Sequence, residues 1–301
     1  MNALPADPAA LQTALAAHGY LADTALATTA WLACRLERPL LCEGAPGVGK
    51  TSFAAALAAV LDGPLIRLQC YEGIDASQAL YDWDFPRQVL HLRTLEASGG
   101  ADPDTTETDL YQRRFLVARP VLQALEASTP DRRAVLLIDE VDRADDEFEA
   151  LLLEVLSEWA VSVPELGRVA AQAPPVVVVT SNRTRDLHDA LTRRCLYHWF
   201  DLPDPARERE IIRRHVPDAS DALTASVLAA ATRIRSLELV KPPGVAETLD
   251  WVQALVRLGL EELDEVAAHL TLGTVVKERD DLLTVRDAGP ITGGAPPRRM
   301  R

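Results

Sequence analysis

A stretch near the start of the chain has the spacing of a phosphate-binding loop, G-x-x-x-x-G-K-[ST]. Its glycines allow backbone N–H groups to turn towards a phosphate, Lys50 can reach the β- and γ-oxygens of a nucleotide, and the Thr51 hydroxyl can bind Mg²⁺. The sequence therefore predicts that a nucleotide binds here, held by Gly44, Ala45, Pro46, Gly47, Val48, Gly49, Lys50, Thr51 and Ser52.

The segments on either side of the loop agree with this prediction. Residues 38–42 are typical of a short buried strand, and residues 52–61 of an alanine-rich helix whose N-terminal dipole favours an anion. The alternative is an ordinary loop rich in glycine and proline. Because the chain has only three lysines and 15 glycines, the motif should arise by accident on the order of once per thousand such chains.

A second group of candidate residues follows an apolar run that ends at residue 138. The run predicts a fully buried parallel strand, and Asp139 and Glu140 emerge at its carboxyl end, where open α/β sheets bind their ligands. Asp139 can bind Mg²⁺ through its water shell, and Glu140 can orient and deprotonate an attacking water. Acids also cap helices, and those at 145–147 are interpreted in that way because apolar residues follow them at helical spacing.

Further along the chain, an asparagine and two arginines could complete such a site. Residues 175–180 predict a third buried strand, after which Asn182 either hydrogen-bonds the γ-phosphate or the attacking water, or merely closes a turn. Arg193 and Arg194 precede an edge or final strand at 195–200. Adjacent arginines are usually a solvated surface, but in a ring-forming ATPase an arginine finger from the neighbouring subunit contributes about 10³ to 10⁵ in rate.

Composition argues against several classes of protein. The chain has 301 residues and a net charge of −14, which disfavours a protein that tracks along nucleic acid, because phosphate contacts require a basic face. The four scattered cysteines are typical of buried free thiols, and the six isolated histidines form no zinc motif. Since no apolar segment reaches 18 residues and no signal-peptide pattern begins the chain, we expect a soluble cytoplasmic protein without a membrane partner.

The predicted elements divide the chain at about residue 202. Residues 1–202 combine N-terminal helices with an α/β nucleotide-binding domain that includes a hairpin at 160–172. Residues 203–286 are predicted to form a separate helical domain beside the nucleotide. The tail, 287–301, is rich in glycine and proline and is predicted to be disordered.

Residues 71–119 are the least readable part and are interpreted as an insertion between core strands. Aromatic and acidic residues at 71–85 either pack against the core or form a docking surface, and packing is favoured because aromatic side chains mostly bury their area. Residues 96–109 are polar and acidic and are expected to form a mobile loop, after which a helix is expected from about 115 to 127.

Taken together, these motifs resemble those of AAA+ ATPases, and more closely those of the MoxR family. GAPGVGKT is similar to that family's Walker A motif, LLIDE to its Walker B motif with DEVDRAD following, and TSN to its sensor 1. Longer strings look like the CoxD-like branch found with genes for molybdenum-containing carbon monoxide dehydrogenase: IRLQCYEG, FLVARPVLQAL, LIDEVDRADDEFEALLLEVLSEW, TSNRTRDLHDALTRRCLYHW and KPPGVAETLDW. The resemblance spans about residues 36–256.

The resemblance implies a P-loop NTPase αβα sandwich of the AAA+ helix-2 insert type, followed by an all-α lid. It implies ATP and Mg²⁺ as cofactors, with Thr51 and Asp139 as the metal-binding side chains. It also implies roles for single residues: Walker A for Lys50 and Thr51, Walker B for Asp139 and Glu140, sensor 1 for Asn182, arginine finger for Arg194 or less favourably Arg193, and an intersubunit contact for Arg143.

The resemblance further implies a homo-oligomeric ring, typically a hexamer, that works with a von Willebrand factor A domain protein in the maturation of a metalloenzyme. One departure concerns sensor 2. Many members have Ser-Pro-Arg where this chain has Pro243-Gly244-Val245-Ala246, so either Lys241 substitutes for the arginine or the lid does not contact the γ-phosphate directly.

We therefore expect an ATP-hydrolysing AAA+ remodelling protein. A DNA-directed AAA+ ATPase is a first alternative, which the net charge disfavours. A nucleotide-gated binding module with little turnover is a second, which the presence of Glu140 beside Asp139 disfavours.

Overall fold

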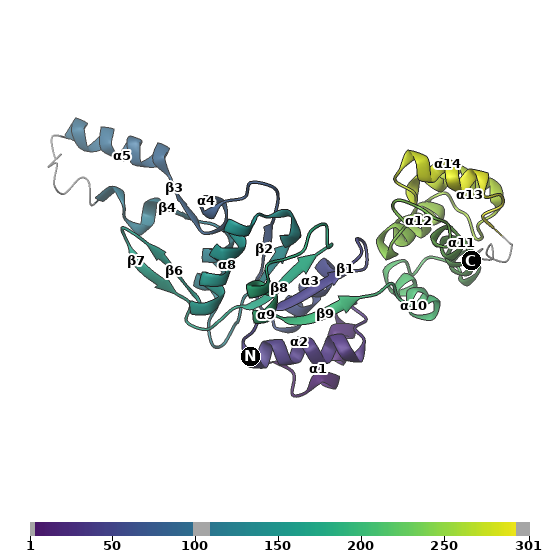
Figure 1. The fold of residues 1–301 in the computed structure, drawn as a ribbon, viewed down its shortest axis with the longest axis horizontal. Coiled ribbons are helices and arrows are strands. Elements are labelled where there is room, and N and C mark those ends of the chain that lie inside the picture. Colours follow the sequence, from purple (N-terminus) through teal and green to yellow (C-terminus); the bar gives the residue numbers. More distant parts are fainter. Residues whose placement is uncertain (1–3, 99–108, 293–301) are drawn as a thin grey trace. The chain divides into compact units, whose positions relative to one another are not determined.

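A five-stranded sheet forms the centre of the α/β part of the chain, in the order β2-β5-β8-β1-β9 (Figure 1). The computed structural model describes residues 4–98 and 109–292. Strand β2 pairs in parallel with β5, β5 with β8, and β8 with β1, which confirms the predicted α/β fold. Strands β5 and β8 are apolar runs buried at every position, as expected of strands inside a parallel sheet. The strands are β1 (Leu40–Gly44), β2 (Leu65–Gln69), β5 (Val135–Asp139), β8 (Val176–Ser181) and β9 (Leu196–Phe200).

Aspartates fix where three of the helices begin. Asp7, Asp23 and Asp145 each accept a hydrogen bond from the backbone N–H three residues later, at 2.8, 2.6 and 2.9 Å. Such caps satisfy N–H groups that have no partner inside the helix, and the third confirms that the acids at 145–147 begin a helix. The helices are α1 (Pro8–Ala17), α2 (Thr24–Leu36), α3 (Lys50–Val60), α7 (Pro120–Ala127), α8 (Asp146–Glu158) and α9 (Asp189–Arg194).

The segment 71–119 contains its own small sheet. Strands β3 (Tyr81–Trp83) and β4 (Leu116–Ala118) pair antiparallel, and the rings of Trp83 and Tyr111 meet edge to face with their centroids 5.2 Å apart. The expected helix begins only at Pro120, because β4 occupies the preceding residues and proline is suited to a first helical turn. The other elements are α4 (Ala76–Ala79), α5 (Phe85–Ser98) and η1 (Arg113–Phe115).

Some of the aromatic residues at 71–85 pack against the core, as expected, and others are exposed. Tyr81 and Trp83 are half-buried against the core of the first part of the chain. Tyr71 and Phe85 are exposed, at 45% and 59%. Residues 99–108, which make up most of the expected mobile loop, lie outside the described residues.

The predicted hairpin is present between α8 and β8. Strands β6 (Ala160–Val163) and β7 (Gly167–Ala170) pair antiparallel, with Ala160 opposite Ala170. Gly167 has a φ of 80° after the turn, a conformation that favours glycine.

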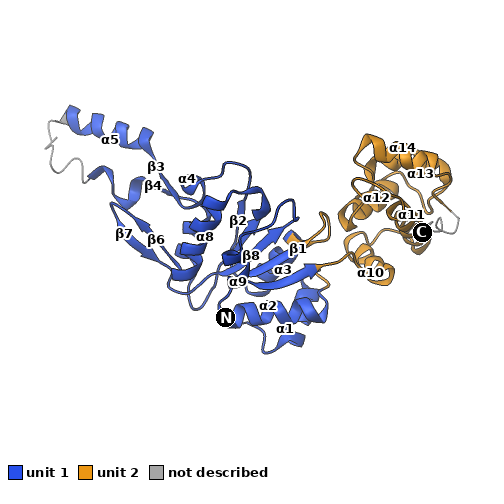
Figure 2. Ribbon diagram, in the orientation of Figure 1, with its two compact units in different colours: residues 1–18, 22–43, 51–199 blue, residues 19–21, 44–50, 200–301 orange. Residues whose placement is uncertain are grey.

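The chain divides into two compact units (Figure 2). The first contains residues 1–18, 22–43 and 51–199, and the second contains residues 19–21, 44–50 and 200–301. The division at residue 200 lies close to the domain boundary expected at 202. However, the phosphate-binding loop groups with the helical residues, a long-range association that no local sequence pattern indicates.

The second unit has a helical core of its own. Trp251 is fully buried in it, and its indole nitrogen donates to the Thr271 hydroxyl at 2.7 Å. The helices are α10 (Pro205–His215), α11 (Asp221–Arg235), α12 (Val245–Arg257), α13 (Glu265–Thr271), η3 (Leu272–Thr274) and α14 (Arg279–Asp287).

The ordered chain continues beyond the residue where the tail was expected to begin. Ile291 is buried, and the backbone N–H groups of Ile291 and Thr292 donate to the Glu265 carboxylate at 2.8 and 2.9 Å. The rest of the expected tail, 293–301, lies outside the described residues. Across the described ranges, the helices are too short or too polar to cross a membrane.

Candidate nucleotide site

The phosphate-binding loop has the backbone that its glycines predict. Gly47 and Gly49 have φ values of 75° and 96°, which glycine adopts without steric cost. A Cβ at Gly47 would lie 2.8 Å from Glu247 Oε2, so a larger residue would displace that carboxylate. Lys50 is only 7% exposed, and its Nζ donates to the carbonyl oxygens of Gly44 and Ala45 at 2.7 and 2.9 Å. The lysine charge is thus held against the loop that the motif assigns to phosphate.

The first turn of α12 contacts this loop within the second unit. The N–H groups of Val245 and Ala246 donate to the Gly47 carbonyl at 3.1 and 3.2 Å. Glu247 accepts the Gly244 N–H at 2.9 Å and so caps the helix. The segment that lacks the expected sensor 2 arginine therefore contacts the loop through its backbone.

Arg235 and Lys241 of the second unit are two cations that lie near the missing arginine in the sequence. Arg235 donates to the carbonyls of Pro243 and Gly244 at 2.7 and 3.0 Å and pairs with the buried Glu208 at 2.7 Å, so it positions the start of α12. Lys241 pairs with Glu278 at 2.8 Å, and its side chain is 65% exposed. The substitution of Lys241 for the arginine stays a prediction.

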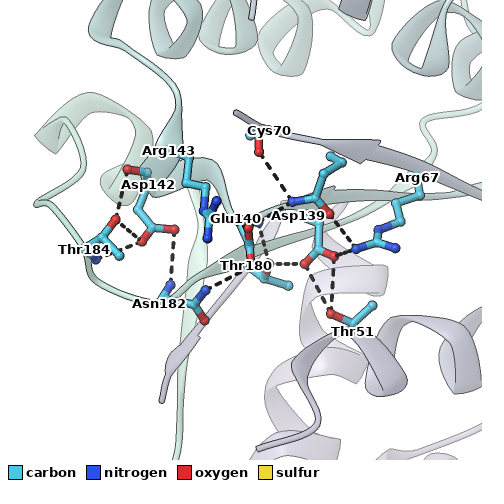
Figure 3. A network of polar contacts seen from close by, with 11 residues as sticks. Thr51, Arg67, Cys70, Asp139, Glu140, Asp142, Arg143, Thr180, Asn182 and Thr184 are labelled. Atoms are coloured by element: carbon cyan, nitrogen blue, oxygen red, sulfur yellow. Dashed lines mark hydrogen bonds and ion pairs between the residues drawn. The ribbon is translucent and has the colours of Figure 1, made fainter. Parts of the chain in front are cut away.

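Asp139 is the centre of a polar network in the first unit (Figure 3). It lies at the carboxyl end of β5 and is 3% exposed. The Thr51 hydroxyl lies 3.2 and 3.3 Å from its two carboxylate oxygens. Thr180 on β8 donates to Oδ1 at 2.5 Å, and Arg67 on β2 donates to Oδ2 at 2.6 Å. The predicted metal-binding pair, Thr51 and Asp139, is therefore brought together.

Glu140 follows Asp139 directly. Polar contacts hold its backbone N–H and both of its carboxylate oxygens. Its φ of 56° lies in the left-handed region, and its N–H donates to the Thr180 hydroxyl at 2.9 Å. Its Oε1 accepts from the Asn182 side-chain amide at 3.3 Å. Its Oε2 accepts from Gln69 at 3.1 Å and pairs with Arg143 at 2.9 Å. The predicted Glu140 and Asn182 therefore meet, and Arg143 joins them from the same chain.

A buried aspartate fixes the loop that carries Asn182. Asp142 is 3% exposed and accepts hydrogen bonds from the Asn182 N–H at 3.2 Å, the Thr184 N–H at 2.8 Å and the Thr184 hydroxyl at 2.7 Å. Burial alone would raise the pKa of Asp142, but these hydrogen bonds outweigh it and hold the pKa below its ordinary value of 3.8. The carboxylate therefore stays ionised and keeps the loop in place.

The same loop is tied to α8 by a second buried acid. Glu149 is fully buried, pairs with Arg185 and accepts the His188 N–H at 2.8 Å. Helix α9 starts only at Asp189, later than the expected start at 185, because residues 185–188 make these contacts.

The two arginines in the last turn of α9 have other contacts within the chain. Arg194 donates to the Leu153 carbonyl at 3.4 Å, and Arg193 is 82% exposed and pairs with Asp189 at 3.6 Å. Arg38 donates to the carbonyls of Arg193 and Arg194 at 2.7 and 2.9 Å and so fixes the end of the helix. A role for either arginine in a neighbouring subunit's site stays a prediction.

Thr51 and Asp139, at the centre of the network, fit a magnesium ion. Hydroxyl and carboxylate oxygens, as on Thr51 and Asp139, are the ligands Mg²⁺ prefers, and it commonly takes one or two protein oxygens together with substrate phosphates. The loop supplies a buried lysine and two glycines with positive φ, as a phosphate cradle requires.

Three side chains that contact Asp139 or Glu140 were missed by sequence reasoning, namely Arg67, Gln69 and Thr180. Arg67 and Gln69 alternate along β2 and so share one face, and Gln69 is in register with Asp139. That alternation next to the strand carrying Asp139 was the available signal. Thr180 gave none, because a threonine that ends a valine run is also ordinary in a strand.

The cysteines are buried and free, as expected. Cys70 lies nearest the network, and its N–H donates to the Asp139 carbonyl at 2.9 Å. Burial and, to a smaller extent, the negative charge of Asp139 raise the pKa of the Cys70 thiol to about 12. The thiol therefore stays protonated at neutral pH and is not a nucleophile of this site.

Residues 39–195, more than half of the chain, match the family described as AAA domain (dynein-related subfamily). The chain belongs to this family. The AAA domain runs from just before β1 to the end of α9 and includes the loop, Asp139, Glu140 and Asn182. It is an ATPase domain of the P-loop type, in agreement with the parallel sheet.

Individual proteins resemble this AAA protein over much of its length. Protein NorQ of Paracoccus denitrificans is 28% identical over 205 residues, which are 67% of this chain and 66% of NorQ, so the match spans just under two thirds of that relative. An uncharacterized protein of Staphylococcus haemolyticus is 22% identical over 229 residues, 74% of this chain and 77% of its own. Among solved structures, the Holliday junction branch migration motor RuvB of Thermotoga maritima aligns with a TM-score of 0.47 and 17% identity, over 90% of this chain and 71% of RuvB.

Proposed function

We propose that this protein hydrolyses ATP and uses the energy to remodel other proteins. The observation that carries the proposal is the contact of the Thr51 hydroxyl with Asp139, which is followed by Glu140 and its partner Asn182 at the carboxyl ends of β5 and β8. This combination of groups suits phosphoryl transfer to water.

Each side chain then has a defined task. Lys50 binds the β- and γ-phosphate oxygens, and Thr51 and Asp139 would hold Mg²⁺, which neutralises charge on the phosphates. Glu140 accepts the proton of the attacking water, and the Asn182 amide, bonded to Oε1, orients that carboxylate.

Phosphate release under steady-state conditions tests this assignment. Lys50→Ala should lose nucleotide binding, because the loop loses its only cationic side chain. Glu140→Gln should bind ATP as the parent does but turn over at least about a hundredfold more slowly, because an amide does not accept the proton. Glu147→Gln, the same change at an exposed acid of the helix start, is the control and should hydrolyse normally. Equal hydrolysis by Glu140→Gln and the parent would refute the catalytic role.

The remodelling role is proposed to follow the MoxR type. NorQ is a relative at 28% identity, and the longer strings quoted above resemble the CoxD-like branch. The protein would then form a homo-oligomeric ring, a hexamer by analogy, and act in the cytoplasm with a von Willebrand factor A domain partner in the maturation of a metalloenzyme of the molybdenum hydroxylase type. Four buried free thiols suit a reducing compartment.

Trapping the assembled state tests this part separately. Glu140→Gln with ATP should sediment as a ring and retain a partner that carries a metal-ion-dependent adhesion site, whereas Lys50→Ala should do neither. A monomer under both conditions would contradict the ring. DNA added at low salt should leave ATP hydrolysis unchanged, because a chain with a net charge of −14 lacks the basic excess that DNA binding uses.

A further inference from the structure

Arg67 is a charged group that contacts Asp139. It lies on β2, which is an edge strand of the five-stranded sheet, and its Nη2 is 2.6 Å from Asp139 Oδ2. The two partners differ in exposure, since the Arg67 side chain is 53% exposed and that of Asp139 is 4% exposed. The same Nη2 also donates to Gln69 Oε1 at 2.5 Å, so a neighbour on the strand holds the guanidinium in this position.

The two oxygens of Asp139 have different partners. Oδ1 accepts from Thr180, a neutral hydroxyl inside the sheet, at 2.5 Å. Oδ2 accepts from Arg67, a full positive charge at the sheet edge. The Thr51 hydroxyl stands 3.2 and 3.3 Å from the two oxygens and carries one proton, so it can donate to one of them at a time. A cation that binds Oδ2 would therefore have to share this oxygen with Arg67 or displace Arg67 from it.

A guanidinium and a divalent cation compete for such an oxygen. Both are attracted by the same negative charge, they repel each other, and both use the lone pairs of the carboxylate. The buried Asp139 is costly to leave without a partner, whereas the half-exposed Arg67 can be hydrated once it is released. An exchange of Arg67 for the cation therefore leaves neither group without a partner.

We infer that Arg67 is a resident counter-charge, which neutralises Asp139 in the metal-free protein and gives up Oδ2 when Mg²⁺ arrives. Arg67 then sets the concentration of Mg²⁺ at which nucleotide is bound tightly. This inference rests on the proposed Mg²⁺ site at Thr51 and Asp139 and names a regulator of that same site.

The test compares Arg67→Met with the parent and with a matched control, Arg113→Met. Arg113 pairs with Glu126 at 2.6 Å, its side chain is 48% exposed, and it is not part of the network around Asp139. Binding of a fluorescent, non-hydrolysable ATP analogue is followed by anisotropy while Mg²⁺ is titrated at constant ionic strength. Arg67→Met should lower the half-saturating Mg²⁺ concentration about threefold to fivefold, the size expected of a half-exposed ion pair, and Arg113→Met should leave it unchanged.

A second measurement needs neither nucleotide nor activity. Mg²⁺ alone should raise the melting temperature of Arg67→Met more than that of the parent, because the variant leaves Asp139 without a counter-charge until the metal binds. If Arg67→Met does not fold, Arg67→Gln, which keeps a hydrogen-bond donor but no charge, is expected to shift the titration in the same direction.

The outcomes separate the possible roles of Arg67. An unchanged Mg²⁺ titration in the variant overturns the inference. A raised half-saturating concentration also overturns it and shows instead that Arg67 orients Asp139 for the metal. If the parent itself binds the analogue without any dependence on Mg²⁺, the proposed metal site fails, and that result is recognised before any variant is made.

Discussion

Thr180 offers a sharp test of how the site is held together. The residue is 1% exposed, and its hydroxyl donates to Asp139 Oδ1 at 2.5 Å and accepts the Glu140 N–H at 2.9 Å. Thr180→Val keeps the shape of the side chain and removes both bonds. A hydrogen bond to a charged group contributes about 1.5 to 3 kcal/mol, and an unsatisfied buried N–H costs about 1 to 3 kcal/mol. We therefore expect a loss of about 3 to 5 kcal/mol in the free energy of unfolding.

The chain contains a matched control for this substitution. Thr224 is also 1% exposed, but its hydroxyl has no hydrogen-bond partner among the described residues. Thr224→Val replaces an unsatisfied buried hydroxyl with a methyl group, so it should be neutral or stabilise the protein by about 1 kcal/mol. The same chemical change is thus expected to destabilise the protein at residue 180 and not at residue 224.

Calorimetry and turnover measure the two consequences. Each variant is compared with the parent in the unfolding transition of the unit that carries the substitution, since Thr180 belongs to the first unit and Thr224 to the second. Thr180→Val should also reduce ATP turnover about tenfold or more, because the backbone of Glu140 loses its anchor and the carboxylate moves. Equal destabilisation by the two substitutions would show that the bonds of Thr180 do not support the site.

Two more predictions concern the arginine finger and acid stability. Arg194→Ala should bind ATP normally and lose about a thousandfold in turnover. Mixing Arg194→Ala subunits with Glu140→Gln subunits should restore activity if the arginine acts in a neighbouring subunit. Normal turnover by Arg194→Ala alone would exclude Arg194 as the arginine finger. The pKa of Asp142 is lowered below 3.8, so its contribution to stability is complete above that pH and is lost as the pH falls through the lower folded value. Asp142→Asn should flatten the acid limb of a stability–pH curve, and an unaltered limb would contradict this.

The parts of the fold that the sequence predicts are those with a strong local pattern. Apolar runs predicted β5 and β8, the glycine–lysine motif predicted the phosphate-binding loop, and acidic residues predicted the start of α8. In each case the residues that determine the element are adjacent in the chain, so propensity and burial lead to the same answer.

The missed parts depend on partners that are distant in the sequence. Strands β3 and β4 have three residues each and pair across the insertion, so neither has a periodicity that stands out. Arg67 belongs to the site only because β2 pairs with β5 in a register that places residue 69 opposite 139. The loop joins the second unit through the bond from Val245 to the Gly47 carbonyl, which nothing near Gly47 indicates.

The backbone of Glu140 shows a conflict between stability and chemistry. Its φ of 56° and ψ of 50° suit glycine, and for other residues such a conformation costs on the order of 1 to 3 kcal/mol. Glycine would adopt this conformation without that cost, but it would lose the carboxylate's contacts with Asn182, Gln69 and Arg143. The proposed reactivity of residue 140 therefore coincides with an unfavourable backbone, and efforts to raise the melting temperature by relieving such positions should leave this residue unchanged.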